Sequence, residues 1–351
     1  MNINYYKIFK IDNVTGCAQL ASFENLNNIE NYVMNILNKC ASAPAERRYK
    51  FCDNKQTTKQ RVENLINGNE IERNCLELSK DLAIAEKNSN TAHAQLKGKI
   101  PVGILLIALA DMQTDDKDYK LILIKSDYDE FIAEGSGNQS SGLSIKNQIF
   151  KTCVYNIRKQ TGGFTWGEIN ASDSTKRCAS YWHSTFLELE ECISDKENTK
   201  RAFNLIKSKI LNPIKNEHKP DYLILYNATI GYMRQVGTFD LDYYKNTIIG
   251  QHTPFDATLN ISELEDKVEK LRNSGKFDAT FTKVPEEIKD KLKEYIKLTD
   301  EIDLKIKHDV AGIENVILKA DLEDGRKGIT IVSREGYEYA KGLARHDSNN
   351  R

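Results

Sequence analysis

The chain has 351 residues, of which 40% are apolar and 29% are charged, so it carries enough apolar side chain for a sizeable buried core. Its 50 Lys and Arg residues almost balance its 51 Asp and Glu residues, and the formal net charge is −1. This balance excludes a uniformly basic, histone-like protein and a strongly acidic tail. A nucleic-acid partner would therefore have to bind a local basic surface.

The sequence contains no segment typical of a membrane helix or an export signal. The most apolar run, residues 101–110, is far shorter than the roughly 20 residues that a spanning helix needs. The N-terminus, MNINYYKIFK, lacks the apolar core of a signal peptide. The 7 cysteines are an odd number without CxxC spacing, so we expect reduced thiols in a cytoplasmic protein with no membrane partner.

The first half of the chain shows both strand and helix patterns. Segments rich in β-formers and bounded by turn residues predict strands at residues 5–11, 17–20, 102–109, 119–124 and 149–157. Apolar residues at three- and four-residue steps predict helices that begin near Leu26, Thr57 and Ile71. Gly162-Gly163 marks the expected boundary, which gives an α+β N-terminal domain at residues 1–162.

The second half, residues 163–351, is predicted to be a mainly helical domain with a terminal hairpin. Helical patterns cover parts of residues 174–192, 194–210, 221–234, 262–275 and 285–300. Ser194 with Glu197, and Ser262 with Glu265, have the spacing of capping boxes. Two β-rich segments around Asp324-Gly325 predict the hairpin. The fold class is therefore α+β, with N-terminal antiparallel hairpins and helices before a mostly helical half.

No catalytic constellation, metal site or cofactor site emerges from the motifs. Cys178 and His183 do not share a helical face, and the histidines are scattered. The Gly/Ser-rich loop at 135–142 matches no nucleophile or phosphate-binding motif, so a surface connector is expected. The acidic residues of 111–118 lack EF-hand spacing, which favours a solvated turn. We therefore expect a protein without enzyme activity.

Two segments carry a local excess of positive charge. Residues 146–159 hold cations and no acid, and residues 196–219 hold many more cations than acids. Such segments can neutralise phosphates, although a solvated helix face is the simpler interpretation. The candidate DNA-binding residues are Lys146, Lys151, Arg158, Lys159, Lys196, Lys200, Arg201, Lys207 and Lys209.

Several segments, taken in order, resemble the bacterial nucleoid-associated protein family (the NdpA-like group). The best stretches are YWHSTFLEL at 181–189 and DKENTKRAF at 195–203. Weaker matches are KSDYDEF at 125–131, KNQIFKTC at 146–153 and EDGRK at 323–327. None of these is a catalytic fingerprint, and the resemblance assigns no binding residue.

The resemblance implies a cytoplasmic protein of the nucleoid that binds double-stranded DNA, as a homo-oligomer, without enzyme activity or cofactor. The competing hypothesis is a protein-interaction adaptor that recruits a partner such as a topoisomerase or an anti-phage defence component. Its binding faces would be the mixed-charge segments 262–275 and 285–300. A hydrolase built on the Gly/Ser loop and the acidic turn is the third alternative, for which we expect no DNA cleavage.

Overall fold

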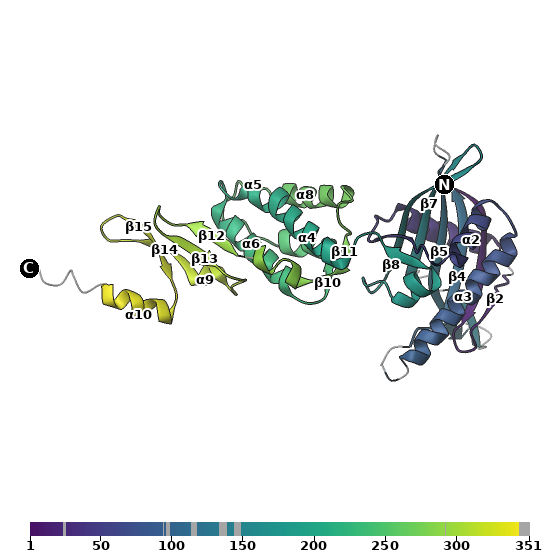
Figure 1. Ribbon diagram of the computed structural model, residues 1–351. Helices are drawn as coiled ribbons and strands as arrows, with labels where there is room; N and C mark the ends of the chain where they lie inside the picture. The colour runs from purple at the N-terminus through teal and green to yellow at the C-terminus, as the bar shows by residue number, and fades with distance from the viewer. Residues whose placement is uncertain are drawn as a thin grey trace, which may run out of the picture. The chain divides into compact units, whose positions relative to one another are not determined.

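The computed structural model divides the chain into two compact units (Figure 1). The sheet unit comprises Met1–Asn198 and Phe277–Thr282, and the helical unit comprises Thr199–Lys276 and Lys283–Arg351. The structure describes residues 1–23, 26–93, 95, 99–113, 118–132, 139–143, 149–291 and 293–343. Within these ranges, side chains are not described at residues 127–132, 139–143, 149–150, 290 and 342–343.

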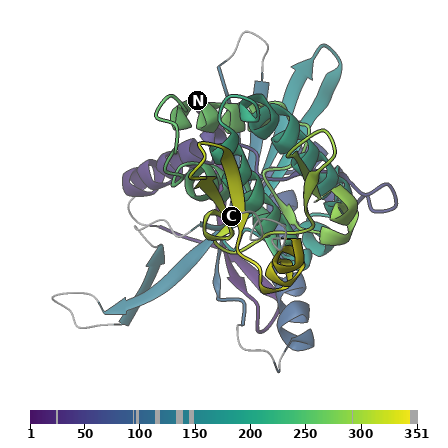
Figure 2. The same ribbon diagram turned by 90° about the vertical axis from the view of Figure 1, so that its left-hand side faces the viewer.

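The sheet unit is built on a nine-stranded antiparallel sheet with the order β2-β1-β4-β5-β7-β8-β3-β9, and β6 pairs with β5. The last part of β5 pairs with β6 alone, and these two strands extend beyond the others as a ribbon (Figure 2). The strands are β1 (Asn2–Asp12), β2 (Cys17–Leu20), β3 (Arg48–Phe51), β4 (Gly103–Asp111), β5 (Asp118–Ile132), β6 (Gln139–Leu143), β7 (Ile149–Gln160), β8 (Gly163–Asp173) and β9 (Leu189–Glu191).

Helices cover both faces of this sheet. Helix α1 (Leu26–Ser42) packs Val33, Ile36 and Leu37 against alternate residues of β4 and β5, and we call this the α1 face. The opposite side, the α3 face, is covered by α2 (Thr57–Ile66), α3 (Ile71–Ala92) and the π-helix η1 (Tyr181–Phe186). Because strand residues alternate between faces, β4 and β5 are apolar on both sides and form the centre of the core.

The helical unit packs short helices around buried aromatic side chains such as Phe203, Tyr226 and Tyr244. Its helices are α4 (Asp195–Ile206, whose first turn belongs to the sheet unit), η2 (Lys207–Leu211), α5 (Asn212–Ile214), α6 (Lys219–Arg234), α7 (Leu241–Tyr243), η3 (Tyr244–Ile249), α8 (Ile261–Asn273), η4 (Pro285–Glu287), η5 (Lys289–Lys291), α9 (Ile313–Val316) and α10 (Arg334–Leu343). The short strands are β10 (Thr238–Asp240), β11 (Thr280–Thr282, which belongs to the sheet unit), β12 (Glu294–Lys297), β13 (Asp303–Ile306), β14 (Ile317–Asp321) and β15 (Lys327–Ile331).

The predicted α+β class and the C-terminal hairpin are confirmed. The hairpin consists of β14 and β15 around Gly325, whose φ of 83° suits glycine. The boundary between units lies at Asn198, not at 162. Gly162, with φ of 90°, is instead in the turn between β7 and β8, which pair along most of their length. The turn glycines that suggested a linker therefore close a hairpin inside the sheet.

Two predicted helices are wrong. Residues 285–300 form the short turns η4 and η5 followed by strand β12, which pairs with β13. Residues 174–192 contain only the short π-helix η1 and then strand β9, which pairs with β3. Strand pairing, with the following strand β13 in the first segment and with the distant strand β3 in the second, overrides the helical spacing of the apolar residues.

The predicted helix starts are partly correct. The backbone N–H of Glu197 donates to Ser194 Oγ at 3.3 Å, so the first capping box supplies a cap for α4. Helix α8 is instead capped by Asn260, whose side chain accepts from the Glu263 N–H at 3.2 Å. The second helix therefore begins two residues earlier than Ser262 indicated.

Buried ion pairs lie at one end of the α3 face. Lys125 Nζ of β5 donates to Glu86 of α3 at 2.9 Å, and both side chains are buried. Asn13 donates to the same carboxylate at 3.2 Å. Burial raises the pKa of Glu86, and the neighbouring Lys125 ammonium opposes that rise. A second buried pair joins Lys151 of β7 to Asp173 of β8.

We expect that Lys125→Met destabilises the protein by about 3–5 kcal/mol, because the Glu86 carboxylate is then buried without its cation. The double variant Lys125→Met with Glu86→Gln should recover much of this loss. Equilibrium urea unfolding of both variants measures the difference. Equal loss in the single and double variants would show that the charge pairing does not stabilise the sheet.

Candidate nucleic-acid interface

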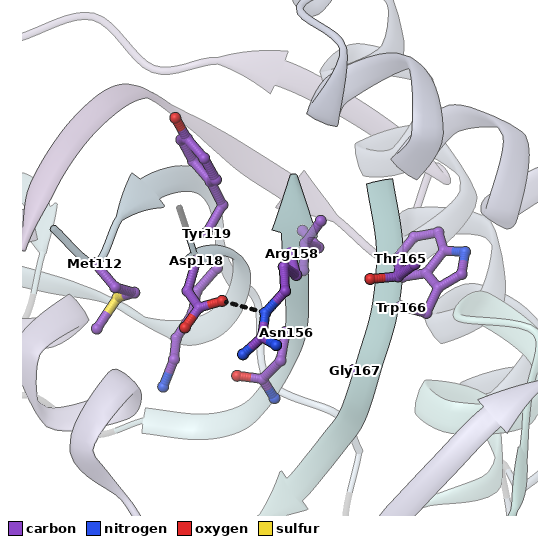
Figure 3. Close-up of a pocket in the computed structure, with 10 residues that line it drawn as sticks. Met112, Asp118, Tyr119, Asn156, Arg158, Thr165, Trp166 and Gly167 are labelled. Atoms are coloured by element: carbon purple, nitrogen blue, oxygen red, sulfur yellow. Dashed lines mark hydrogen bonds and ion pairs between the residues drawn. The ribbon is translucent and has the colours of Figure 1, made fainter. Parts of the chain in front are cut away.

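A polar groove lies on the part of the α1 face formed by β5, β7 and β8. Ile122 of β5 and Val154 of β7 pack in the α1 core cluster. Residues two positions away on the same strands, Lys120 and Asn156, therefore point to the same face. They line a hollow of about 450 Å³ together with Asp118, Arg158 and Thr165 (Figure 3). We call this surface the polar groove.

Hydrogen bonds order the charged groups of the groove. Arg158 Nε donates to Asp118 Oδ1 at 3.1 Å, which orients the guanidinium over the hollow (Figure 3). Lys120 Nζ donates to the Ala41 carbonyl at 2.7 Å, and burial lowers the pKa of this lysine. An ammonium held by one acceptor retains two further N–H donors. The groove therefore offers two positioned cations beside one carboxylate.

A second, smaller hollow of about 100 Å³ shares Lys120 and Asn156 with the first. Its polar lining includes Thr152, Asn170 and Ser172, and residues that follow α1 border it. Thr152 Oγ1 lies 2.7 Å from Ser172 Oγ. The buried Oδ1 of Asn170 accepts no hydrogen bond from any described residue. The two hollows together form one polar track along neighbouring strands.

An irregularity in strand pairing shapes the groove. The register of β7 and β8 shifts between Tyr155 and Ile157, opposite Gly167. A Cβ at Gly167 would lie 3.2 Å from the Asn156 carbonyl oxygen, so glycine allows the two strands to approach closely. Asn156 Nδ2 donates to the Glu168 carbonyl at 2.7 Å across this irregularity. Gly167 thereby positions the Asn156 amide at the edge of the hollow.

The structure separates the predicted cations of the first basic segment. Arg158 lies in the polar groove, whereas Lys151 is buried on the opposite face with Asp173. Lys159 lies over the Tyr119 ring at 4.9 Å from its centroid. Lys146 is outside the described residues. Of the described cations in this segment, only Arg158 therefore lines the groove.

Most cations of the second segment have partners inside the chain. Lys200 pairs with Glu287 at 2.7 Å, and Lys207 pairs with Glu294 at 3.2 Å. Arg201 is exposed and donates to the Lys276 carbonyl at 3.3 Å. Lys196 and Lys209 are exposed, the former in the sheet unit and the latter in the helical unit. Ion pairs therefore neutralise part of the positively charged face that was expected for residues 196–219.

Glu294 is the centre of a polar cluster in the helical unit. Its buried carboxylate accepts from Lys215 at 2.5 Å, from Lys207, and from Tyr222 Oη at 2.9 Å. Burial acts to raise the pKa of Glu294, but these donors together hold it below its ordinary value of 4.5. The lysines also lie over tyrosine rings, Lys207 over Tyr226 at 4.7 Å from the centroid. The cluster ties strand β12 to the helices.

A depressed carboxylate pKa stabilises the fold above the unfolded pKa, and this stabilisation is lost as the pH falls through the folded value. We therefore expect the native chain to lose stability below about pH 4.5, the ordinary glutamate value. Glu294→Gln should be less stable at neutral pH and should show a shallower decline on acidification. Thermal unfolding across that pH range measures both effects. A parallel pH profile in the variant would contradict this role.

Among the described residues, the Cys178 candidate lacks the features of a reactive thiol. Burial raises the pKa of the Cys178 thiol to about 12, so the sulfur is protonated at neutral pH and is a poor nucleophile. Within the described ranges, no three His, Cys, Asp or Glu side chains group in a way that could hold a metal ion. Part of the acidic turn and residues 135–138 of the Gly/Ser loop lie outside those ranges, and residues 139–142 belong to β6.

The sequence prediction missed Lys120, Asn156 and Asn170. The signal was present as a partial alternation, because Thr152, Asn156 and Arg158 of β7 and Asn170 and Ser172 of β8 recur at even spacings, interrupted in β7 by Val154, whereas β4 is apolar from Gly103 to Ala110. A strand with one polar side has a face that no helix covers. Pairing of β7 with β8 then places these polar sides next to each other, and that step requires β8, which was not predicted as a strand.

No family model and no curated protein matches this chain. Among the described residues, no helix combines the length and apolar character needed to cross a bilayer. The functional argument therefore depends on the geometry of the chain itself.

Proposed function

We propose that this protein is a non-enzymatic DNA-binding protein of the bacterial nucleoid, and that the polar groove contacts the phosphate backbone. The observation that supports the proposal most directly is that Lys120 and Arg158 line one open hollow together with amide and hydroxyl groups. Cations and neutral donors are the groups that proteins use for phosphate oxygens. The resemblance to the nucleoid-associated family supports the same function independently of the groove.

The charge balance limits how the chain would bind DNA. Lys151 and Lys207 are paired with buried carboxylates and Lys200 with Glu287, so they contribute little to a continuous basic strip. Arg158 is also paired, with Asp118, but its side chain is 54% exposed. Among the described residues that line the groove, the two cations outnumber the one acid, Asp118. In the smaller hollow, Glu46 is paired with Lys176 at 3.2 Å. We therefore propose a small number of local phosphate contacts without sequence readout, rather than dense coating of DNA.

The groove predicts a defined change in salt dependence. Arg158→Ala with Lys120→Met removes two cations, so the log–log salt slope of duplex DNA binding should flatten by about 2. Affinity at low salt should fall to a similar extent for unrelated sequences, because phosphates carry no sequence information. Fluorescence anisotropy with two unrelated duplexes over a series of salt concentrations measures both quantities.

The matched control is Arg73→Ala with Lys80→Ala. These cations lie on α3, on the opposite face of the sheet, and are partly exposed in pairs with Glu70 and Glu77. The control removes the same charge and should leave the slope almost unchanged. Equal effects of the two double variants, or no effect of either, would contradict the groove as the contact. Arg201→Ala with Lys209→Ala tests the second basic segment in the same assay.

The adaptor hypothesis receives less support from the faces first considered for it. Helix α8 buries Leu264, Val268 and Leu271, and its Arg272 pairs with Asp242 inside the chain. Residues 285–291 form only two short 3₁₀ turns, and residues 294–297 form strand β12, which contributes the buried Glu294. A pull-down that retains a protein partner after nuclease treatment, without DNA affinity of the pure chain, would favour the adaptor.

A further inference from the structure

The segment that follows α9 is ordered but buries very little of itself. Strands β14 and β15 pair only with each other among the described strands. From Asp321 to Lys341, every residue except Gly328 is exposed. Figure 1 shows this hairpin and α10 (yellow) at the end of the helical unit. An isolated two-stranded hairpin and an isolated ten-residue helix are each marginal in water, so the segment lacks a covering surface.

The exposed side chains of this segment include large apolar groups. Ile329 is 45% exposed, Ile331 43% and Val332 58%. The register places Ile317 opposite Ile331, so isoleucines gather on one side of the hairpin. On α10, Tyr339 is 83% exposed. Contiguous apolar side chains of this kind mark an interaction surface.

The outer edge of β15 is suited to pairing with another strand. Its sequence, KGITI, continues into Val332, has no proline, and carries a charge only at its first residue. Folded proteins commonly protect such an edge with a central lysine, a proline or a bulge. Strand β14 has such protection in Lys319, at its centre. The unprotected edge is therefore that of β15.

We propose that the occupant of this surface is a second copy of the chain, joined by antiparallel pairing of β15 with β15 about a two-fold axis. An isologous contact requires a self-complementary strand. With Thr330 on the axis, Ile329 of one copy lies opposite Ile331 of the other. The two hairpins then form one four-stranded sheet, in which the edge groups of both β15 strands are paired.

The charge of the segment favours a second copy over other occupants. Residues 313–343 contain 5 basic and 6 acidic side chains, so two copies meet without strong repulsion. Many of these charges are paired locally, for example Lys327 with Asp321 at 2.6 Å and Arg326 with Asp324 at 2.7 Å. A polyanion or an anionic lipid surface attracts segments with net positive charge, which this segment lacks. The inference does not depend on the proposed DNA binding.

The test is the oligomeric state of the full chain by sedimentation velocity. We expect a dimer for the natural sequence and a monomer for Ile329→Lys and for Ile331→Pro, which respectively place a charge and remove an outward-facing N–H at the free edge of β15. The matched control is Val236→Lys, which changes a valine that is 87% exposed elsewhere in the helical unit and should remain dimeric. Circular dichroism confirms that each variant is folded.

A cross-linking experiment tests the register directly. Residues opposite each other in an antiparallel pair have Cα atoms about 4.5–5.5 Å apart, which is within disulfide range. Thr330→Cys should therefore form covalent dimers under mild oxidation, well above the level of Val236→Cys. A monomeric natural sequence, a dimer that persists in both edge variants, or equal cross-linking of the two cysteine variants would overturn the proposal. Dependence of dimer formation on added DNA or another protein would overturn it as well.

Discussion

The pairing of lysines with carboxylates across distant parts of the chain is the constraint on which the structure depends. Lys125 and Glu86 join the centre of the sheet to α3 without access to water, and Asn13 adds a further donor to the same carboxylate. A buried charge without its partner is strongly unfavourable, so these contacts fix the position of α3 relative to the strands. The apolar core provides most of the driving force for folding, but apolar contacts alone do not specify such a position.

The same pairing explains why the cations are not all available to a ligand. Strand alternation places Lys151 with Lys125 on the α3 face, and Arg158 with Lys120 on the α1 face. The first pair of lysines is neutralised by buried acids, and the second pair borders an open hollow. In the helical unit, Glu294 binds Lys207 and removes it from the exposed charge. Strand register and tertiary contacts therefore determine whether the surface charge at a given place is positive or negative. The net charge of the chain alone does not determine it.

The dependence of these contacts on tertiary structure also determines how much of the fold and of the site could be predicted from the sequence. Strands β4 and β5 were predicted because long apolar runs are local, and the hairpin β14–β15 was predicted from its turn residues. The role of Lys151 was missed because its partner, Asp173, is 22 residues away on the next strand. The predicted helix at 285–300 failed because residues 294–297 pair with β13, and Glu294 of that strand is held by Lys207, 87 residues earlier. Local patterns contain no information on such pairs.

The two proposed surfaces differ in chemistry and belong to different units. The polar groove has fixed donors on a rigid sheet, which suits a polar or anionic ligand. The β14–β15 hairpin offers apolar side chains and an open strand edge, which suit a protein strand. If β15 pairs two copies, each dimer carries two grooves, and a flexible polyanion that reaches both would gain affinity through effective concentration. A few phosphate contacts in each copy could then give useful affinity in a chain with almost no net charge.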